Sequence, residues 1–367
     1  MKPTTLALAI AAGLLLATGA AHAQGLRAPA AAPPAVQTPV LAMPYYTGEQ
    51  ALQGIYTHHL PPLAQAFVAA ADGLAATSER HCSGQASMAE LRTAWQQALL
   101  RWQALSSPAV GPLVARRSQR QIDFWPSRPK LLRQALARAP QTLADMDRVG
   151  TPAKGFPALE QLLAQDTALT PTQCRFITLA AQAIAVEARE LQAALDALAR
   201  KDWSESPEDT ATTFAEWINQ WLGGLERLRW AHIEKPLQSH RTAGRRGAVE
   251  FPRHTRETNL ADWRAQWQSL RAQARLTPAQ LAQPPQPGQS LVPIEALLMG
   301  KGQLALAQRW AQALDAVNAG MDALKPQASP RELLALTQRM KAVTVLYQNE
   351  VAAALDVPLG FSDADGD

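Results

Sequence analysis

The stretch Thr170-Pro171-Thr172-Gln173, with the apolar-rich residues that follow it to about 201, decides the fold class. A threonine hydroxyl can cap the free backbone N–H groups at a helix start, and proline has the φ angle that the first helical residue needs. Glutamine at the third helical position can reach back to the cap. The apolar residues that follow recur with the 3.6-residue period of one helical face. The stretch therefore predicts one long helix over residues 171–201.

Three further segments open with the same pattern, and each precedes a run rich in Ala, Leu, Gln and Arg. They are Ser206-Pro207-Glu208-Asp209, Thr277-Pro278-Ala279-Gln280 and Ser329-Pro330-Arg331-Glu332. No stretch has the sustained apolar–polar alternation and β-branched enrichment that are typical of strands. The sequence predicts an all-α protein, with long helices over residues 49–77, 86–106, 171–201, 207–240, 301–325 and 330–354, and shorter ones over 128–138, 157–165, 256–275 and 291–299.

The first 23 residues have the three parts of a cleavable secretory signal. Lys2 supplies a positive charge, residues 6–17 are a run of apolar residues and one glycine, and Ala21-His22-Ala23 is a cleavage site. The apolar run is too short for a membrane-spanning helix, and no later segment offers the required length. We expect a signal peptide over 1–23, a disordered Ala- and Pro-rich leader over 24–44, and a periplasmic mature chain without a transmembrane segment.

The length and the charge of the chain limit which domain organisation and which partners are expected. The mature chain is longer than one hydrophobic core usually supports, so two helical-bundle subdomains are expected, over 45–203 and 204–367. The 35 basic residues nearly balance the 31 acidic ones, for a net charge of +4. The short basic run Arg241 to Arg246 lacks interleaved aromatic residues, so we expect no nucleic-acid partner.

Cys82 and Cys174 are the only cysteines. Two cysteines in an oxidising compartment most simply form one disulfide, and neither lies in a C-x-x-C metal-binding spacing. The chain-entropy model gives a bond closing a loop of about 90 residues a stabilising effect of roughly 4 kcal/mol. We expect a structural disulfide between them.

The sequence contains none of the common catalytic motifs, and no two histidines are spaced four residues apart. Asp363, Asp365 and Asp367 resemble the opening of a calcium loop. Such a loop needs glycine at its sixth position, whereas Gly366 falls at the fourth. A complete EF-hand is therefore excluded, and the three acids are either a solvated tail or participants in another site.

The stretch Gly155-Phe156-Pro157-Ala158-Leu159-Glu160 is the most informative candidate for a site. Glycine and proline before an apolar run mark a helix beginning at Pro157, with Glu160 one turn in. Two interpretations of Glu160 stay open. It is an acid placed to favour the helix dipole, or a carboxylate in a partly buried pocket that coordinates a cation or pairs with an arginine.

Four stretches together resemble the imelysin-like family of bacterial periplasmic and outer-membrane-associated proteins. They are Asp123-Phe124-Trp125-Pro126, Gly155 to Glu160, Glu234-Lys235-Pro236-Leu237 and the ending Gly360-Phe361 to Asp365-Gly366-Asp367. The resemblance spans about residues 50–367. The family includes an insulin-cleaving peptidase and proteins linked to iron uptake, so the resemblance implies a two-domain helical fold with a site near the domain interface.

The family's signature, G-x-H-x-x-E, is proposed to bind a metal. Gly155 and Glu160 match its first and last positions, but Pro157 stands at the histidine position. Proline offers a metal no lone pair, and a hydrolytic zinc usually takes three protein ligands. Proline in place of the histidine puts the chain in a branch of the family that has proline at this position. The missing histidine argues against enzymatic activity without deciding the question.

The leading hypothesis is a non-enzymatic protein of an iron-uptake or metal-homeostasis system that binds a metal ion, a chelate or an envelope partner. Its expected site lining is Arg120, Asp123, Trp125, Gly155, Pro157 and Glu160. Glu160 and Asp123 are the candidate metal ligands, suited to iron or another divalent or trivalent cation. One alternative is a metal-dependent peptidase in which His58, His59 or His254 joins Glu160. A second is an envelope protein-interaction module.

Overall fold

The computed structural model describes residues 42–242, 244 and 247–360, and this part of the chain contains helices and no strand. The expected signal peptide, most of the expected leader and the acids Asp363, Asp365 and Asp367 lie outside the described residues. The last residues of the leader segment are described, and the carbonyl oxygen of Pro44 lies against Gly300. No helix of the described part is long and apolar enough to cross a membrane.

The order of the helices agrees closely with the prediction. The elements are α1 (Gly48–Gln53), η1 (Gly54–His59), α2 (Leu60–Cys82), α3 (Met88–Leu105), α4 (Pro112–Ala115), α5 (Ser118–Ile122), α6 (Pro129–Ala137), α7 (Leu143–Asp147), η2 (Thr151–Ala153), α8 (Gly155–Leu163), α9 (Pro171–Ala199), α10 (Pro207–Glu226), η3 (Arg227–Glu234), α11 (Lys235–Thr242), α12 (Arg256–Ala274), α13 (Pro278–Ala282), α14 (Ile294–Gly300), α15 (Leu304–Ala323), α16 (Pro330–Leu346), η4 (Tyr347–Val351) and α17 (Ala352–Ala354).

All four predicted helix starts are confirmed. The hydroxyls of Thr170, Ser206, Thr277 and Ser329 each accept a hydrogen bond from the backbone N–H of the third helical residue. At every one of these positions except Ser206, the side chain of that third residue also reaches back to the cap residue's N–H. Local sequence therefore fixes where these helices begin.

Three of the long helices contain a π-helical segment. η1 joins α1 to α2, η3 joins α10 to α11, and η4 joins α16 to α17. The sequence predicts each of these runs as one continuous helix, and the chain does continue through each of them. η2 is a single 3-10 turn.

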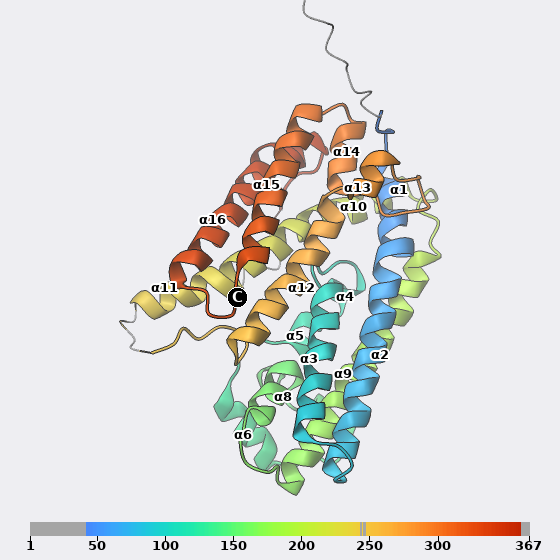
Figure 1. Ribbon diagram of the computed structural model, residues 1–367. Helices are drawn as coiled ribbons and strands as arrows, with labels where there is room; N and C mark the ends of the chain where they lie inside the picture. Colours follow the sequence, from blue (N-terminus) through green and yellow to red (C-terminus); the bar gives the residue numbers. More distant parts are fainter. Residues whose placement is uncertain (1–41, 243, 245–246, 361–367) are drawn as a thin grey trace, which may run out of the picture. The chain divides into compact units, whose positions relative to one another are not determined.

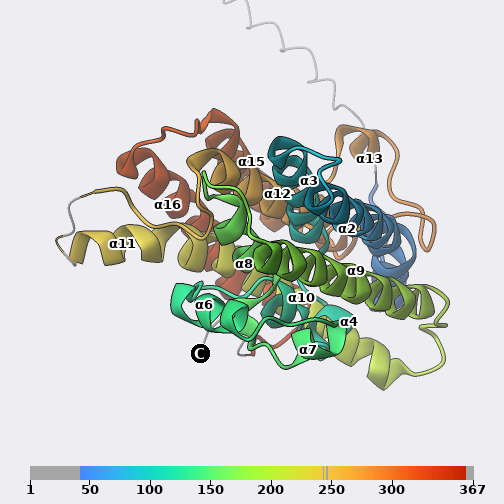
Figure 2. The same ribbon diagram turned by 90° about the horizontal axis from the view of Figure 1, so that it is seen from below.

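The packing brings helices from both halves of the sequence together. α2 packs against α3 and α9, and α15 against α16. α12 contacts α3, and α10 contacts α1, so the halves touch at more than one place (Figure 1). The described residues, from 42 to 360, form one unit, and the predicted division between 203 and 204 stays a prediction. Figure 2 shows α6 and α7 on the outside of α8 and α9.

Several predicted helix boundaries are wrong by two to five residues, and the helices expected to begin at 291 and 301 begin at Ile294 and Leu304. The helix expected to end at 77 continues to Cys82, whose disulfide bond to Cys174 holds the last turn of α2 against the first turn of α9. The disulfide itself is confirmed. The helix expected to begin at Pro157 begins at Gly155, so Glu160 lies further into α8 than expected.

Candidate functional site

The start of α8 is held in place from two sides. Gly155 has φ +71°, and a Cβ atom there would lie 2.2 Å from the carbonyl oxygen of Ile122 in α5. Only glycine fits such a close approach in the left-handed region. On the opposite side, Trp95 of α3 donates from Nε1 to the carbonyl oxygen of Phe156 at 3.1 Å. These contacts fix the position of Glu160 one and a half turns later.

Glu160 is largely buried, and its Oε1 accepts a hydrogen bond from the backbone N–H of His254 at 2.8 Å. No described residue donates a hydrogen bond to Oε2. Burial raises the pKa of Glu160 from 4.5 to about 7, against the lowering effects of the Arg253 charge and the His254 N–H. Near neutral pH this carboxyl group is therefore poised between its protonated and ionised forms.

Glu160 and His254 line one pocket of about 300 Å³. Arg92 and Trp95 of α3 also line it, as do Thr255 and Thr258 at the start of α12. Arg92 donates from Nε to the carbonyl oxygen of Leu163 at 2.7 Å, which ties the end of α8 to α3. The pocket thus offers a carboxyl group, an exposed imidazole and an indole wall on a fixed frame.

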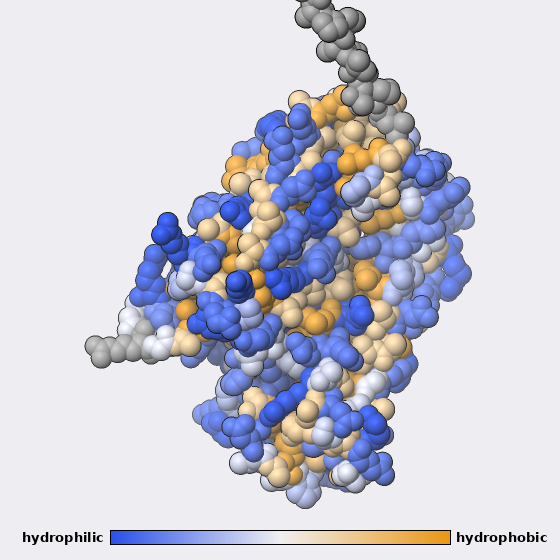
Figure 3. Space-filling view, viewed as in Figure 1, coloured by the Kyte–Doolittle hydropathy of each residue, from blue (hydrophilic) through white to orange (hydrophobic). Residues whose placement is uncertain are grey.

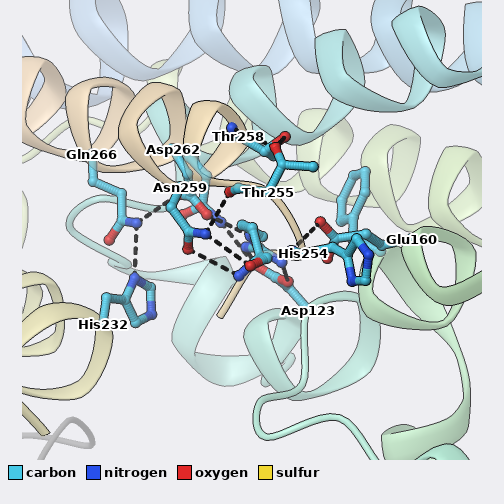
Figure 4. Close-up of polar contacts among 12 residues, drawn as sticks. Asp123, Glu160, His232, His254, Thr255, Thr258, Asn259, Asp262 and Gln266 are labelled. Carbon is cyan, nitrogen blue, oxygen red and sulfur yellow. Dashed lines mark hydrogen bonds and ion pairs between the residues drawn. The ribbon is translucent and has the colours of Figure 1, made fainter. Parts of the chain in front are cut away.

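Asp123 is the second predicted site residue that the structure brings to this region, but its oxygens are already paired. Arg253 donates from Nη1 to Oδ1 at 2.7 Å and from Nη2 to Oδ2 at 2.8 Å (Figure 4). Gln103 donates to Oδ2 at 2.7 Å. Burial tends to raise the pKa of Asp123, but the charge and hydrogen bonds of Arg253 outweigh it, and the net pKa is lowered.

Behind Asp123 lies a buried polar network that sequence analysis missed. Arg253 also donates from Nε to Asp262, and Gln266 donates to Asp262 at 2.6 Å and bonds Nδ1 of His232 at 3.0 Å (Figure 4). Burial, together with the charges of Arg227 and Arg253, lowers the pKa of His232 to about 3, so this histidine is neutral. Arg253 is therefore the shared ion-pair partner of the two buried aspartates, Asp123 and Asp262.

The remaining predicted residues lie apart from the pocket. Arg120 is exposed and Trp125 is half-buried, and neither lines the pocket at Glu160. Pro157 is buried inside α8. Gly155 lines a different cavity of about 640 Å³, together with Lys154 and Glu187.

Of the three histidines considered as partners of Glu160, only His254 contacts it, and it does so through its backbone N–H. His58 bonds the carbonyl oxygen of Gly288, and His59 bonds Gln273. Within the described residues, no group of three or more His, Cys, Asp and Glu side chains is placed to hold a metal ion. The assignment of Asp123 and Glu160 as metal ligands stays a prediction.

The polar spacing of α12 could have revealed the network. Asn259, Asp262, Gln266 and Gln273 recur at helical intervals and are all buried. A polar stripe of this kind resembles a solvated face in a sequence, whereas here it faces Arg253, His232 and His59.

The fold and the sequence point to the same relatives. An imelysin-like protein from Psychrobacter arcticum 273-4 has a similar structure, with a TM-score of 0.67 and 18% sequence identity over 86% of this chain and 97% of that one. A putative iron-regulated protein A precursor from Parabacteroides distasonis ATCC 8503 also gives a TM-score of 0.67, with 11% identity over 84% of this chain and 95% of that one. None of the curated proteins matches the sequence. The family model described as imelysin, peptidase M75, matches residues 55–356, and the chain therefore belongs to the imelysin family.

Proposed function

We propose that the pocket at Glu160 and His254 binds a small metal chelate or a cationic ligand, and that the protein acts without catalysis in iron uptake or metal homeostasis. The observation that carries the proposal is the state of the Glu160 carboxyl group. Oε1 is held by the His254 N–H, and Oε2 has no hydrogen-bond donor among the described residues, in a pocket of about 300 Å³. A ligand that presents a hydrogen-bond donor or a positive charge would give Oε2 of Glu160 a partner.

The geometry favours a chelate over a bare ion. Both oxygens of Asp123 are engaged by Arg253, so Glu160 is the predicted metal ligand with an unengaged oxygen. One carboxylate is too few for a tight site, because iron and calcium sites need several oxygen ligands. A chelate brings the other ligands with it, and the Trp95 indole offers it an apolar wall.

The position of the pocket fits the expected site between two bundles. Trp95 and Glu160 belong to the predicted N-terminal bundle, whereas His254, Thr255 and Thr258 belong to the predicted C-terminal one. The iron assignment draws on the family resemblance and on the likeness to the putative iron-regulated protein A precursor from Parabacteroides distasonis. The secretory signal in the sequence supports a periplasmic location. Envelope iron-uptake components as partners follow from the same family resemblance.

Calorimetric titration of the purified protein with iron(III) citrate, zinc and calcium tests this function, with wild type beside Glu160→Gln. We expect iron(III) citrate to bind, and the substitution to weaken binding at least about tenfold, or 1.4 kcal/mol. Glu205→Gln, which changes an exposed glutamate far along the chain, is the matched control and should bind like wild type. Equal binding by wild type and Glu160→Gln would contradict the proposal, as would the absence of any heat of binding.

A peptidase is the second candidate, because Glu160 and His254 lie in one pocket and a carboxyl group with a pKa near 7 suits a general base. Incubation with a mixture of unfolded peptides and zinc, followed by mass spectrometry, separates the two functions. Cleavage that disappears in both Glu160→Gln and His254→Ala would establish the peptidase. We expect no cleavage.

A further inference from the structure

The segment from Arg116 to Lys154 concentrates positive charge. It contains nine basic residues and three acidic ones, an excess of six, whereas the whole chain has a net charge of only +4. Of the three acids, only Asp147 is exposed. Asp123 is buried against Arg253, and Asp145 caps α7 by accepting from the backbone N–H of Thr142.

Most of these cations are exposed and make no ion pair with any described residue. Arg116 is the main exception, since it is held by Glu187 and Glu190. Arg148 lies 3.8 Å from Asp145. Within the segment 116–154, the exposed cations that make no ion pair with any described residue are Arg117, Arg120, Arg128, Lys130, Arg133 and Arg138. We call these six the basic surface.

The basic surface is carried by α5, α6 and the residues beside them. In α6, Leu132 and Ala135 are buried, whereas Lys130 and Arg133 are exposed on the side that faces away from the core. Figure 2 places α6 on the outside of α8, with which it is in contact. The cations of α6 therefore lie on its outer side, away from α8.

One aliphatic side chain lies among the cations of α6, where Leu131 is 40% exposed. Leu143 in α7 is 38% exposed and lines the cavity that contains Asp147 and Glu187. The aromatic residues nearest in sequence, Phe124 and Trp125, are half-buried. On the face drawn in Figure 3, by comparison, hydrophobic residues lie in small groups among hydrophilic ones.

We propose that the basic surface, together with the exposed Leu131 of α6, docks the protein on a bilayer that contains anionic phospholipids. Exposed Lys and Arg side chains next to an anionic bilayer are attracted to its surface potential, and an exposed leucine can enter the headgroup boundary. Single-stranded nucleic acid is the less suitable occupant, because its binding relies on exposed aromatic side chains for base stacking. The bound orientation would bring the outer side of α6 to the lipid headgroups.

Co-sedimentation of the purified protein with vesicles tests this inference. One set is pure phosphatidylcholine, and the other contains about one third phosphatidylglycerol. We expect at least about tenfold tighter binding to the anionic vesicles, weakening steeply as salt is added, because salt screens surface charges. Equal binding to both sets, or binding to single-stranded DNA but not to anionic vesicles, would overturn the proposal.

Paired variants locate the surface. Lys130→Glu with Arg133→Glu should weaken binding to anionic vesicles at least about tenfold, since each cation near the bilayer contributes about fivefold. The control Arg331→Glu with Lys341→Glu makes the same charge change at exposed positions of α16 and should stay within about twofold of wild type. Should the first pair fail to fold, as judged by circular dichroism, Lys130→Gln with Arg133→Gln replaces it. Retained binding in a folded α6 variant, or equal loss in the control, would refute the assignment.

Discussion

Arg253 and Asp123 form a two-bonded ion pair, with both terminal nitrogens of the guanidinium donating to the two carboxylate oxygens at 2.7 and 2.8 Å. Both side chains are almost wholly buried, and 130 residues separate them in the sequence. The pair fastens the loop before α12 to the end of α5. Because His254 follows Arg253 directly, the ion pair between Arg253 and Asp123 also positions the backbone N–H that donates a hydrogen bond to Glu160.

Removal of the guanidinium should destabilise the protein strongly. Arg253→Met leaves Asp123 and Asp262 buried without their shared cation, and we expect a loss of about 3–5 kcal/mol in the free energy of unfolding. Urea denaturation measures it. Arg309→Met breaks an exposed ion pair with Glu350 and should cost far less. A loss no larger than that of the control would show that the buried pair is not needed.

Glu160 should make the stability of the protein depend on pH. Its pKa is about 7 in the folded chain and near 4.5 when unfolded, so between these values the folded chain holds a proton that the unfolded chain has released. Stability of wild type relative to Glu160→Gln should therefore be greatest below about pH 4.5 and fall by on the order of 3 kcal/mol as the pH rises through about 7. Urea denaturation of both proteins across this range gives the difference. A constant difference would mean that the pKa of Glu160 is not raised.

Gly155 should tolerate no side chain. Gly155→Ala places a Cβ atom 2.2 Å from the carbonyl oxygen of Ile122, at φ +71°. Gly84 has nearly the same φ, +75°, but nothing lies within 4 Å of its Cβ position. Gly84→Ala should therefore lower the free energy of unfolding only by the cost of placing alanine in the left-handed region, about 1–2 kcal/mol. Gly155→Ala should lower it by clearly more. Equal losses in thermal unfolding would mean that the approach to Ile122 relaxes easily.

The disulfide should contribute a large part of the free energy of unfolding. Cys82 and Cys174 are 92 residues apart, and replacing both with serine should lower the free energy of unfolding by roughly 4 kcal/mol on the chain-entropy model. Urea denaturation compares the variant with wild type. A thiol assay on unreduced, denatured wild type should find no free thiol, and two free thiols would contradict the bond.

The helices were predictable because their signals are local. Thr170, Ser206, Thr277 and Ser329 each cap a helix through a hydroxyl that lies a few residues from its partner. Such contacts form within one turn, so a short window of sequence contains both members. The short helices α4, α5 and α7 escaped prediction because they are only four or five residues long and show no periodicity.

The site was predictable only in part. Asp123 and Glu160 were identified from the sequence, and the structure does bring both to the loop at Arg253 and His254. Arg253 itself was not identified, since one arginine among many carries no sign of a partner 130 residues away. Arg120 and Trp125 are close to Asp123 in sequence, yet neither lines the pocket at Glu160.

The disulfide also divides the polypeptide topologically. Asp123 and Glu160 both lie inside the covalent ring closed by Cys82 and Cys174, whereas Arg253 and His254 lie on the linear chain outside it. A single proteolytic cut anywhere between residues 83 and 173 would therefore leave one covalently connected molecule with both carboxylates still attached. The pocket is formed by residues of the disulfide-closed ring and residues of the chain outside it. After such a cut these two parts would remain covalently linked, so they would still associate within one molecule.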